Sequence, residues 1–437
     1  MMHALRYLTT TIVTALLWLG MPSSPLWGQS TASDQAILRL QHLLQRNSRD
    51  ASVYYRLGDA YIQKARETGD LTYINLAEKA LQRCLEIDPR HSGAARHLAY
   101  ASYMRHAFDE AAAQAKKAVA LDPTDGHAYG ILGDAYLEVG RYEEATQAYR
   151  RMIQLQEDLY AYSRLSALKS LRGDVEGAIA DLERAIRLGQ MQERPPESIA
   201  WAMWQLGNEH LARDNLTAAE ASYHEALKTF PGYYRAFAGL AQVRVAQRRF
   251  PEAIELYQKA IAIVPLPEYA AALGDVYTAL GRADEAQQQY DLVEYIGHLN
   301  TLNKVLYNRE LAYFYADHDR RLPEALELAK RELEVRRDIY AYDVLAWALY
   351  KNGQPAEALV AMTEALKLGT QDAWLFFHAG MVHHRLGEGA QAHGYLRRAL
   401  ATNPSFHPLH AEVAERTLKD IAGQRGTAMT QETSDDR

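Results

Sequence analysis

The side chains with the clearest capacity for chemistry in this sequence are histidines near its C-terminal end. Imidazole rings bind transition metals, and ligands on one helix need a spacing of three or four residues to share a face. His378 and His383 are five residues apart, so their rings diverge. His407 and His410 have a suitable spacing, but Pro408 places them across a helix start. We therefore predict no metal site and no cofactor.

Sequence signatures of catalysis are also missing. The chain has no Gly-rich phosphate loop, no G-x-S-x-G turn, no H-E-x-x-H and no paired C-x-x-C motif. Cys84 is its only cysteine, so no disulfide can form within the chain. The net charge of −7 and the lack of a basic run argue against a nucleic-acid surface. These observations predict a protein that is not an enzyme and has no nucleic-acid partner.

Helices must position all the other side chains. The helical pattern is clearest in residues 126–157. Tyr129, Leu132 and Tyr136 recur at helical spacing and share one face of a first short helix. A second helix follows a Gly-Arg turn. Gly133 and Ala145 are small where larger side chains would hold the two helices apart. One such hairpin cannot bury its own apolar face, so it needs neighbours.

The anchoring alanine of the second helix recurs through the chain, mostly at steps of 33 or 34 residues. Its copies are Ala77, Ala111, Ala145, Ala178, Ala219, Ala253, Ala286, Ala325, Ala358 and Ala392. A helix–turn–helix of this period, with Leu-Gly, Tyr, Ala and Pro at fixed offsets, resembles the tetratricopeptide repeat family. The resemblance covers residues 51–404 as ten repeats. It implies an all-α fold, a right-handed solenoid in which each repeat packs on the next.

The segments around the repeats complete the predicted organisation. We expect residues 29–50 to hold an N-terminal capping helix that begins at Ser33, and residues 405–423 to hold a C-terminal one. Residues 424–437 are polar and predicted to be disordered. Insertions near 191–197 and 301–304 divide the repeats into three blocks, which are 51–190, 200–300 and 305–404.

Residues 1–28 differ in kind from the repeats. Arg6 is their only charged residue, and Leu8 to Leu19 form a short uncharged run that precedes the small Gly28. This order is typical of a secretory signal peptide, and the run is shorter than the roughly 20 residues of a membrane span. We expect export to the periplasm or secretion. The alternative is an uncleaved N-terminal membrane anchor.

The family resemblance also implies where a ligand would bind. In tetratricopeptide superhelices the first helices of successive repeats line a concave groove. Aromatic and arginine side chains, which are enriched at binding hot spots, fall at groove positions here. Packing against neighbouring helices is the alternative role for these rings. The predicted groove residues are Trp201, Trp204, Arg309, Tyr313, Tyr340, Asp343, Trp347, Tyr350, Lys351, Trp374, Phe377, His384 and Arg385.

Together these patterns indicate a non-catalytic protein–protein interaction scaffold of the bacterial cell envelope. It would bind a peptide or a helix of a partner protein in its concave groove. Two alternatives remain open. The aromatic C-terminal groove would bind a glycan or another small ligand, or the array would self-associate as a structural spacer.

Export generates a prediction about the mature protein. Because Arg6, the short apolar run and a small residue precede Gln29, the N-terminal sequence of protein from its native cells should begin between Gln29 and Ser33. Edman degradation or mass spectrometry of the terminal peptide measures this. Recovery of an intact Met1 from the membrane fraction would favour the anchored alternative.

Overall fold

The computed structural model describes residues 32–302 and 308–435, without the side chains at 300–302, 308 and 424–435. Within these ranges the chain forms 22 α-helices and no strand. None of the helices in the described ranges is both long and apolar enough to cross a membrane. The predicted signal peptide lies outside the described residues.

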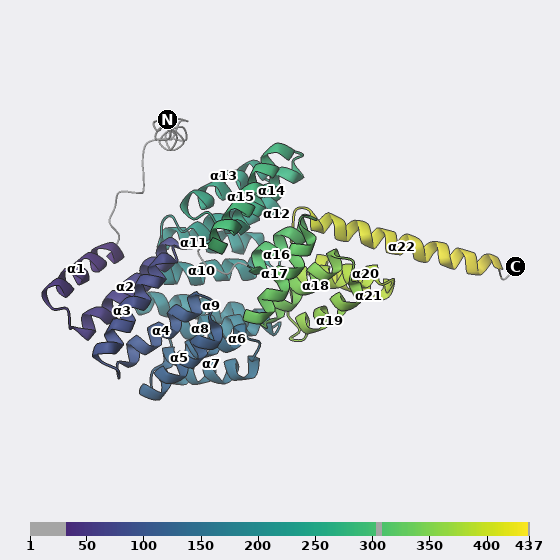
Figure 1. The fold of residues 1–437 in the computed structure, drawn as a ribbon. Helices are drawn as coiled ribbons and strands as arrows, with labels where there is room; N and C mark the ends of the chain where they lie inside the picture. The colour runs from purple at the N-terminus through teal and green to yellow at the C-terminus, as the bar shows by residue number, and fades with distance from the viewer. Residues whose placement is uncertain (1–31, 303–307, 436–437) are drawn as a thin grey trace, which may run out of the picture.

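Twenty of the helices form ten antiparallel hairpins that pack in chain order (Figure 1). They coincide with the ten predicted repeats. In order the hairpins are α2 (Ala51–Thr68) with α3 (Thr72–Ile87), α4 (Ser92–Met104) with α5 (Phe108–Leu121), α6 (Gly126–Glu138) with α7 (Tyr142–Leu155), α8 (Leu159–Leu171) with α9 (Val175–Met191), α10 (Pro196–Leu211) with α11 (Leu216–Thr229), α12 (Tyr234–Ala246) with α13 (Phe250–Ile263), α14 (Pro267–Ala279) with α15 (Ala283–Leu302), α16 (Asn308–Asp317) with α17 (Leu322–Val335), α18 (Ile339–Lys351) with α19 (Pro355–Ala365), and α20 (Ala373–Arg385) with α21 (Gly389–Thr402).

Single helices flank the hairpins. α1 (Ala32–Arg46) packs on α2, and its Ser33, expected as the N-cap, lies inside the helix and donates a hydrogen bond to Glu67 Oε2 (2.6 Å). α22 (His410–Asp435) packs on α21 and then projects away from the body of the protein (Figure 1). Its backbone stays helical beyond the boundary we expected at residue 423. The side chains there lie outside the described residues, so the disorder of the tail stays a prediction.

The anchoring alanines hold each hairpin together. Nine of the ten have no exposed surface, and Ala286 is 4% exposed. In five hairpins the first helix carries a glycine that packs against the residue four positions after the anchoring alanine, because the two helices approach closely. A Cβ on Gly133 would lie 2.4 Å from the ring of Tyr149. This confirms that small residues at the helix crossing set the hairpin geometry.

A tyrosine of the second helix also bonds back to the first. The Tyr149 hydroxyl donates to the carboxylate of Asp134, the residue after Gly133, at 2.8 Å. The same arrangement recurs in two other hairpins. A glycine is followed directly by a polar acceptor, and a tyrosine fifteen residues after that acceptor donates a hydrogen bond to it. These are Gly207, Asn208 and Tyr223, and Gly274, Asp275 and Tyr290.

The superhelix closes on itself after slightly less than six repeats. The main-chain carbonyls that end α6, α8 and α10 accept hydrogen bonds from segments 192 to 199 residues further along the chain. We call this line of contacts the seam. Its bonds run from Arg337 N to Glu138 O (2.9 Å), from the Thr370 hydroxyl to Leu171 O, and from the Asn403 side-chain amide to Leu211 O (3.0 Å).

Buried charges reinforce one end of the seam. The Arg336 guanidinium contacts Glu138 at 2.8 Å and Glu332 at 2.9 Å. Arg309 contacts Asp338 at 2.7 Å. All five side chains are largely buried, so removal of any one would leave an unpaired charge away from water.

The N-terminal hairpin is tied to the middle of the chain in a similar way. Arg66 in α2 pairs with Glu197, which is 3% exposed, at 2.9 Å. Glu197 ends the predicted insertion at 191–197, so this insertion contributes to an internal contact as well as to a connecting loop. The inner face is therefore not an open groove along its whole length. Later repeats cover much of it.

The hairpin contact generates a stability prediction. Replacing Ala145 by Leu overpacks a position without free volume and should lower the free energy of unfolding by about 1–3 kcal/mol. Glu143→Leu is the matched control, because the Glu143 side chain is 79% exposed. Denaturant unfolding measures both. Equal destabilisation of the two variants would contradict the assigned contact.

The seam generates a second prediction, with two glycines as a matched pair. Gly140 and Gly281 both occupy the left-handed region, at φ 75° and 70°. A Cβ on Gly140 would lie 2.3 Å from the carbonyl oxygen of Arg337, whereas a Cβ on Gly281 would meet nothing within 4 Å. Both alanine variants carry left-handed strain of roughly 1–2 kcal/mol, but only Gly140→Ala should open the seam.

The expected result is a larger radius of gyration by small-angle X-ray scattering for Gly140→Ala, with unchanged helicity by circular dichroism. Gly281→Ala should keep the wild-type radius. Identical radii for both variants and the wild type would show that the seam does not hold the superhelix closed.

Candidate ligand-binding cavity

The curvature of the superhelix forms a partly open cavity of about 650 Å³. Its wall is built mainly by the first helices of hairpins five to ten, from α10 to α20, and by residues 403–408 before α22. Ser170 of α8 and Tyr257 of α13 also contribute. Each of the first helices contributes its inner face, because the small residues of the hairpin contact place the other face against the second helix. Cavities of 300–1,000 Å³ are typical of sites for small ligands.

Aromatic rings make up much of the cavity wall. They come from α10, α13, α14, α16, α18 and α20 and from the segment before α22, so they surround the space. The aromatic lining residues are Trp204, Tyr257, Tyr269, Tyr313, Phe314, Tyr340, Trp374 and Phe406.

Acidic side chains outnumber basic ones in the same wall. The carboxylates are Glu209, Glu268, Asp275, Glu310, Asp317 and Asp372, and the permanent cations are Arg213 and Arg235. The Arg235 guanidinium lies 5.1 Å from the ring centres of both Trp204 and Tyr234. The cavity wall therefore combines an excess of acidic side chains with aromatic rings. Such a wall favours cations over anions.

One of these carboxylates is fully engaged by protein groups. Asp275 lies 2.6 Å from His318 Nε2 and 3.1 Å from His407 Nε2, and it accepts a hydrogen bond from Tyr290. Burial alone would raise the pKa of Asp275, but the bonds from His318 and His407 outweigh it and hold that pKa well below its usual range. Asp275 thus links α14, α16 and the segment before α22.

Two carboxylates are far less engaged. Burial, reinforced by the nearby carboxylate of Glu310, raises the pKa of Glu268 to about 7. Burial also raises the pKa of Glu310, whose Oε2 atom is inaccessible and accepts no hydrogen bond from the described residues. Neither forms an ion pair with a described Lys, Arg or His within 4 Å. The charges of Arg309 and Arg336 oppose the effect of burial on Glu310, and the Glu268 side chain is exposed.

The predicted groove residues divide into three sets. Four line the cavity, and they are Trp204, Tyr313, Tyr340 and Trp374. Three lie in the packed core behind it, and they are Asp343, Trp347 and Phe377, each exposed by 2% or less. The others lie outside the cavity wall, and they are Trp201, Arg309, Tyr350, Lys351, His384 and Arg385.

The core set has evident packing partners. Trp347 Nε1 donates to Asp317 at 2.7 Å, and its ring stacks on His378 and Tyr350. Asp343 accepts from the Tyr313 hydroxyl at 2.7 Å. These side chains support the cavity wall from behind. Any contact between them and a ligand stays a prediction.

Several residues outside the wall also have protein partners. Arg309 belongs to the seam. Lys351 pairs with Asp319 at 2.6 Å, and its ammonium lies 5.3 Å from the centre of the Trp347 ring. Arg385 is exposed, and His384 and Trp201 are half-buried.

The histidines that opened the sequence analysis have structural partners. His383 contacts Glu388 at 2.5 Å, and His378 contacts Asp343 at 2.9 Å. In the described parts of the chain, no three His, Cys, Asp or Glu side chains are arranged to hold a metal ion.

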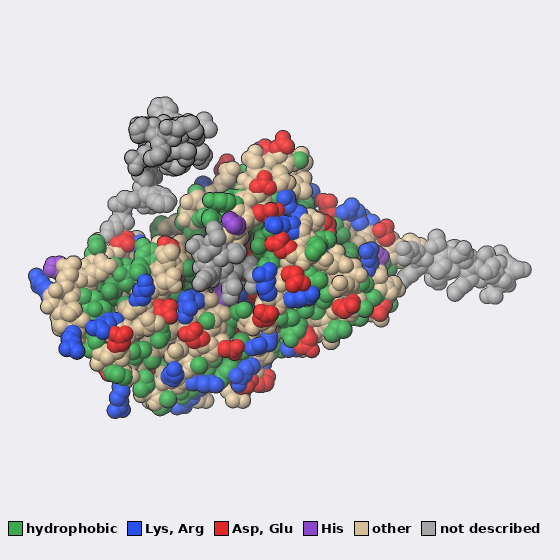
Figure 2. Space-filling model, viewed as in Figure 1, with side chains coloured by type: hydrophobic (Ala, Val, Ile, Leu, Met, Phe, Trp, Pro, Cys, Tyr) green, Lys and Arg blue, Asp and Glu red, His purple; other side chains and the backbone are tan. Residues whose placement is uncertain are grey.

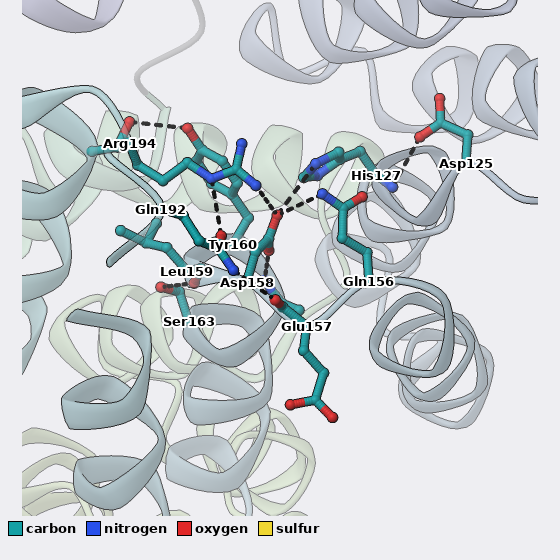
Figure 3. Close-up of polar contacts among 12 residues, drawn as sticks. Asp125, His127, Gln156, Glu157, Asp158, Leu159, Tyr160, Ser163, Gln192 and Arg194 are labelled. Carbon is teal, nitrogen blue, oxygen red and sulfur yellow. Dashed lines mark hydrogen bonds and ion pairs between the residues drawn. The ribbon is translucent and has the colours of Figure 1, made fainter. Parts of the chain in front are cut away.

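A second buried polar cluster lies between hairpins three and five (Figure 3). Asp158 has no exposed surface and is contacted by His127 at 3.4 Å, Arg194 at 3.1 Å and Gln156 at 3.0 Å. It also caps α8 by accepting from Ala161 N. Burial lowers the pKa of His127 to about 4. Because several protein donors engage Asp158, this cluster joins successive repeats.

Sequence reasoning missed Glu268 and Glu310. Each lies in the first turn of its helix, where acidic residues are common because they complement the helix dipole. The only sequence signal for these two residues was their position within the repeat. That position places both of them at the starts of neighbouring first helices.

Comparisons with known proteins agree with this architecture. Models of tetratricopeptide repeats match residues 51–91, 102–171, 205–266 and 344–408, together more than half of the chain. The chain is 26% identical over 244 residues to Tetratricopeptide repeat protein 37 of Xenopus laevis, covering 54% of this chain and 15% of that protein. It is 29% identical over 117 residues to the TPR repeat-containing protein MJ1428 of Methanocaldococcus jannaschii, covering 25% and 20%.

The chain therefore spans a fifth or less of the length of these two relatives. Among solved structures, the human IFIT1 dimer with PPP-AAAA aligns with a TM-score of 0.50 and 16% identity, over 76% of this chain and 77% of that one. This likeness concerns the fold alone. With ten hairpins in register and matching repeat models along most of its length, the chain belongs to the tetratricopeptide repeat family.

Proposed function

We propose that this protein is a non-catalytic protein-interaction scaffold that receives a short, extended segment of a partner protein in its interior cavity. Membership of the tetratricopeptide repeat family supports a role in protein binding. The observation that carries the proposal is the cavity itself, which is partly open, lies on the inner side of six repeats and is lined by rings and charges.

The size of the cavity favours a short extended segment over a helix. A volume of about 650 Å³ holds a few residues, whereas a helix with its side chains is roughly 10–12 Å across. An extended chain presents side chains and main-chain groups in every direction. It can therefore use polar wall groups around the cavity such as the Gln242 side chain.

The wall rings are suited to recognition. Tyr and Trp bury large area with little loss of rotamer freedom, and they keep a polar group for hydrogen bonds. Tyr340 donates to Asp372 at 3.4 Å, and Trp374 contacts the rings of Phe406 and His407. These contacts hold the rings in place before a ligand arrives, which reduces the entropy lost on binding.

The setting we propose is the bacterial cell envelope. It rests on the sequence of residues 1–28, with its single charge, short apolar run and small residue. The outer face drawn in Figure 2 carries acidic and basic side chains interspersed with one another. This mixture is consistent with a solvated exterior and with recognition inside the molecule.

The experiment uses random octapeptides displayed on phage and selected on the wild-type protein. Peptides selected on the cavity should bind Trp374→Ala and Trp204→Ala at least about tenfold more weakly, because aromatic hot spots lose 2 kcal/mol or more on truncation. Tyr295→Ala is the matched control, since this ring is 59% exposed on α15 and lies outside the cavity.

Circular dichroism and thermal melts establish that each variant keeps its fold. Two cavity variants are used because the two rings have different surroundings: Trp374 packs on neighbouring rings, whereas the Arg235 guanidinium lies 5.1 Å from the centre of the Trp204 ring. If every selected peptide binds both folded cavity variants as tightly as the wild type, recognition occurs elsewhere on the scaffold and the proposal is wrong.

A further inference from the structure

We propose that the Gln242 side chain and the Tyr257 hydroxyl form a subsite in the cavity for one main-chain amide unit of the bound segment. This inference rests on the proposed function and names the part of a peptide that these two side chains hold.

Four hairpins carry a tyrosine four residues after the anchoring alanine, and in three of them its hydroxyl has the same kind of partner. The hydroxyls of Tyr149, Tyr223 and Tyr290 each donate to a side chain fifteen residues earlier, at 2.8 to 2.9 Å. In these hairpins the hydroxyl proton is therefore used within the protein. The acceptors are Asp134, Asn208 and Asp275.

The fourth tyrosine, Tyr257 of hairpin six, lacks this bond. The residue fifteen positions before it is Gln242. Within the part of the chain that the structure describes, neither the Tyr257 hydroxyl nor the Gln242 amide group has a hydrogen-bond partner. Hairpin six thus leaves two polar groups free at the place where the other three hairpins join theirs.

Two sequence differences account for the missing bond. In the three bonded hairpins a glycine precedes the acceptor, and a Cβ on that glycine would lie 2.4 Å from the tyrosine ring. Hairpin six has the fully buried Ala241 at this position. Its methyl group keeps the Tyr257 ring out of the place that the other three rings occupy. Gln242 is also one methylene longer than Asn208.

Both free groups line the cavity. Tyr257 is only 2% exposed, and a tyrosine buried to this degree normally has a partner for its hydroxyl. The charge of Asp275 in the next hairpin acts on Tyr257, but that carboxylate is bound by Tyr290, His318 and His407 instead. A bound segment would supply the partner that the protein does not.

The two groups match a peptide unit in their hydrogen-bonding capacity. The Gln242 amide offers a donor and an acceptor, and the Tyr257 hydroxyl can donate or accept. A residue in an extended chain presents its N–H and C=O on the same side, as in the hydrogen-bonded pairs of antiparallel sheets. Gln242 can bond both groups, and Tyr257 can donate to the second lone pair of the carbonyl.

The subsite carries no charge of its own. Burial raises the pKa of the Tyr257 hydroxyl, so it stays protonated near neutral pH, and a glutamine side chain does not titrate. Neutral donors and acceptors suit a neutral amide better than an ion. Because every peptide has main-chain amides, this subsite fixes the position of a segment without restricting its sequence, and the rings of the wall select its side chains.

The probes are octapeptides selected by phage display on the wild-type protein that depend on Trp204 and Trp374 for binding. Isothermal titration calorimetry measures their affinity for Tyr257→Phe and Gln242→Leu. Each variant should bind about fivefold more weakly than the wild type, the loss expected for one hydrogen bond. Tyr257→Phe should keep the wild-type melting temperature, because its hydroxyl bonds no described group.

Tyr149→Phe is the matched control. It removes the same atom from a tyrosine at the same repeat position, but this hydroxyl bonds Asp134 and lies outside the cavity wall. Tyr149→Phe should therefore lower the melting temperature and keep the wild-type affinity for the peptides. The two phenylalanine variants should thus show opposite effects on stability and on binding.

A second arm tests whether the main chain of the peptide is what binds. Each octapeptide is resynthesised with an ester in place of one main-chain amide at a time, which removes an N–H donor and weakens the carbonyl acceptor. One ester position should weaken binding to the wild type about fivefold. The same ester should cause no further loss in Gln242→Leu, as expected when both changes remove one interaction.

Wild-type affinity in either Tyr257→Phe or Gln242→Leu would overturn the inference. So would a peptide in which no ester matters but replacement of an Asn or Gln side chain by Leu does, because the amide bound would then be a side chain. Either result leaves the proposed function intact, since the probes still depend on Trp204 and Trp374. If no selected peptide depends on these rings, the proposed function fails and the subsite fails with it.

Discussion

The structure depends on the seam, where the superhelix meets itself. Every helix ends with main-chain carbonyls that it cannot satisfy internally. In α6, α8 and α10 a carbonyl of the last residue accepts a hydrogen bond from a segment almost six repeats later. Three such bonds in successive repeats fix the pitch and curvature of the superhelix. The cavity, its volume and its lining residues all follow from that pitch.

Closure imposes an electrostatic constraint on the inner face. Side chains that would lie in water on an open solenoid are enclosed, and enclosed charges need partners. The pairs of Arg66 with Glu197, Arg164 with Asp134 and Arg336 with Glu138 meet this requirement. Asp317 and Asp372, which line the cavity, are instead bound by neutral donors, the Trp347 indole and the Tyr340 hydroxyl.

The fold was largely predictable from sequence, because its information is local and repeated. Ala145 and Gly133 mark a helix crossing by their size alone, and ten copies in register leave little ambiguity. The seam was not predictable. The seam depends on small rotations between successive hairpins that add up over six repeats. No local sequence pattern predicts the total rotation. Trp347 and Phe377 fall at groove positions by register, yet the pitch of this superhelix places them in the core. Trp204, Tyr313, Tyr340 and Trp374 fall at groove positions and do reach the cavity.

The seam also restricts how this protein can evolve. A linear repeat array unfolds piecewise and tolerates gain or loss of whole repeats, because each repeat interacts only with its neighbours. Here Glu138, Leu171 and Leu211 are matched to donors 192 to 199 residues away. Deletion or duplication of one hairpin between the partners would shift all three matches by one repeat. The number of repeats between them is thus a selected property, and the two halves of the molecule should gain and lose stability as a single cooperative unit.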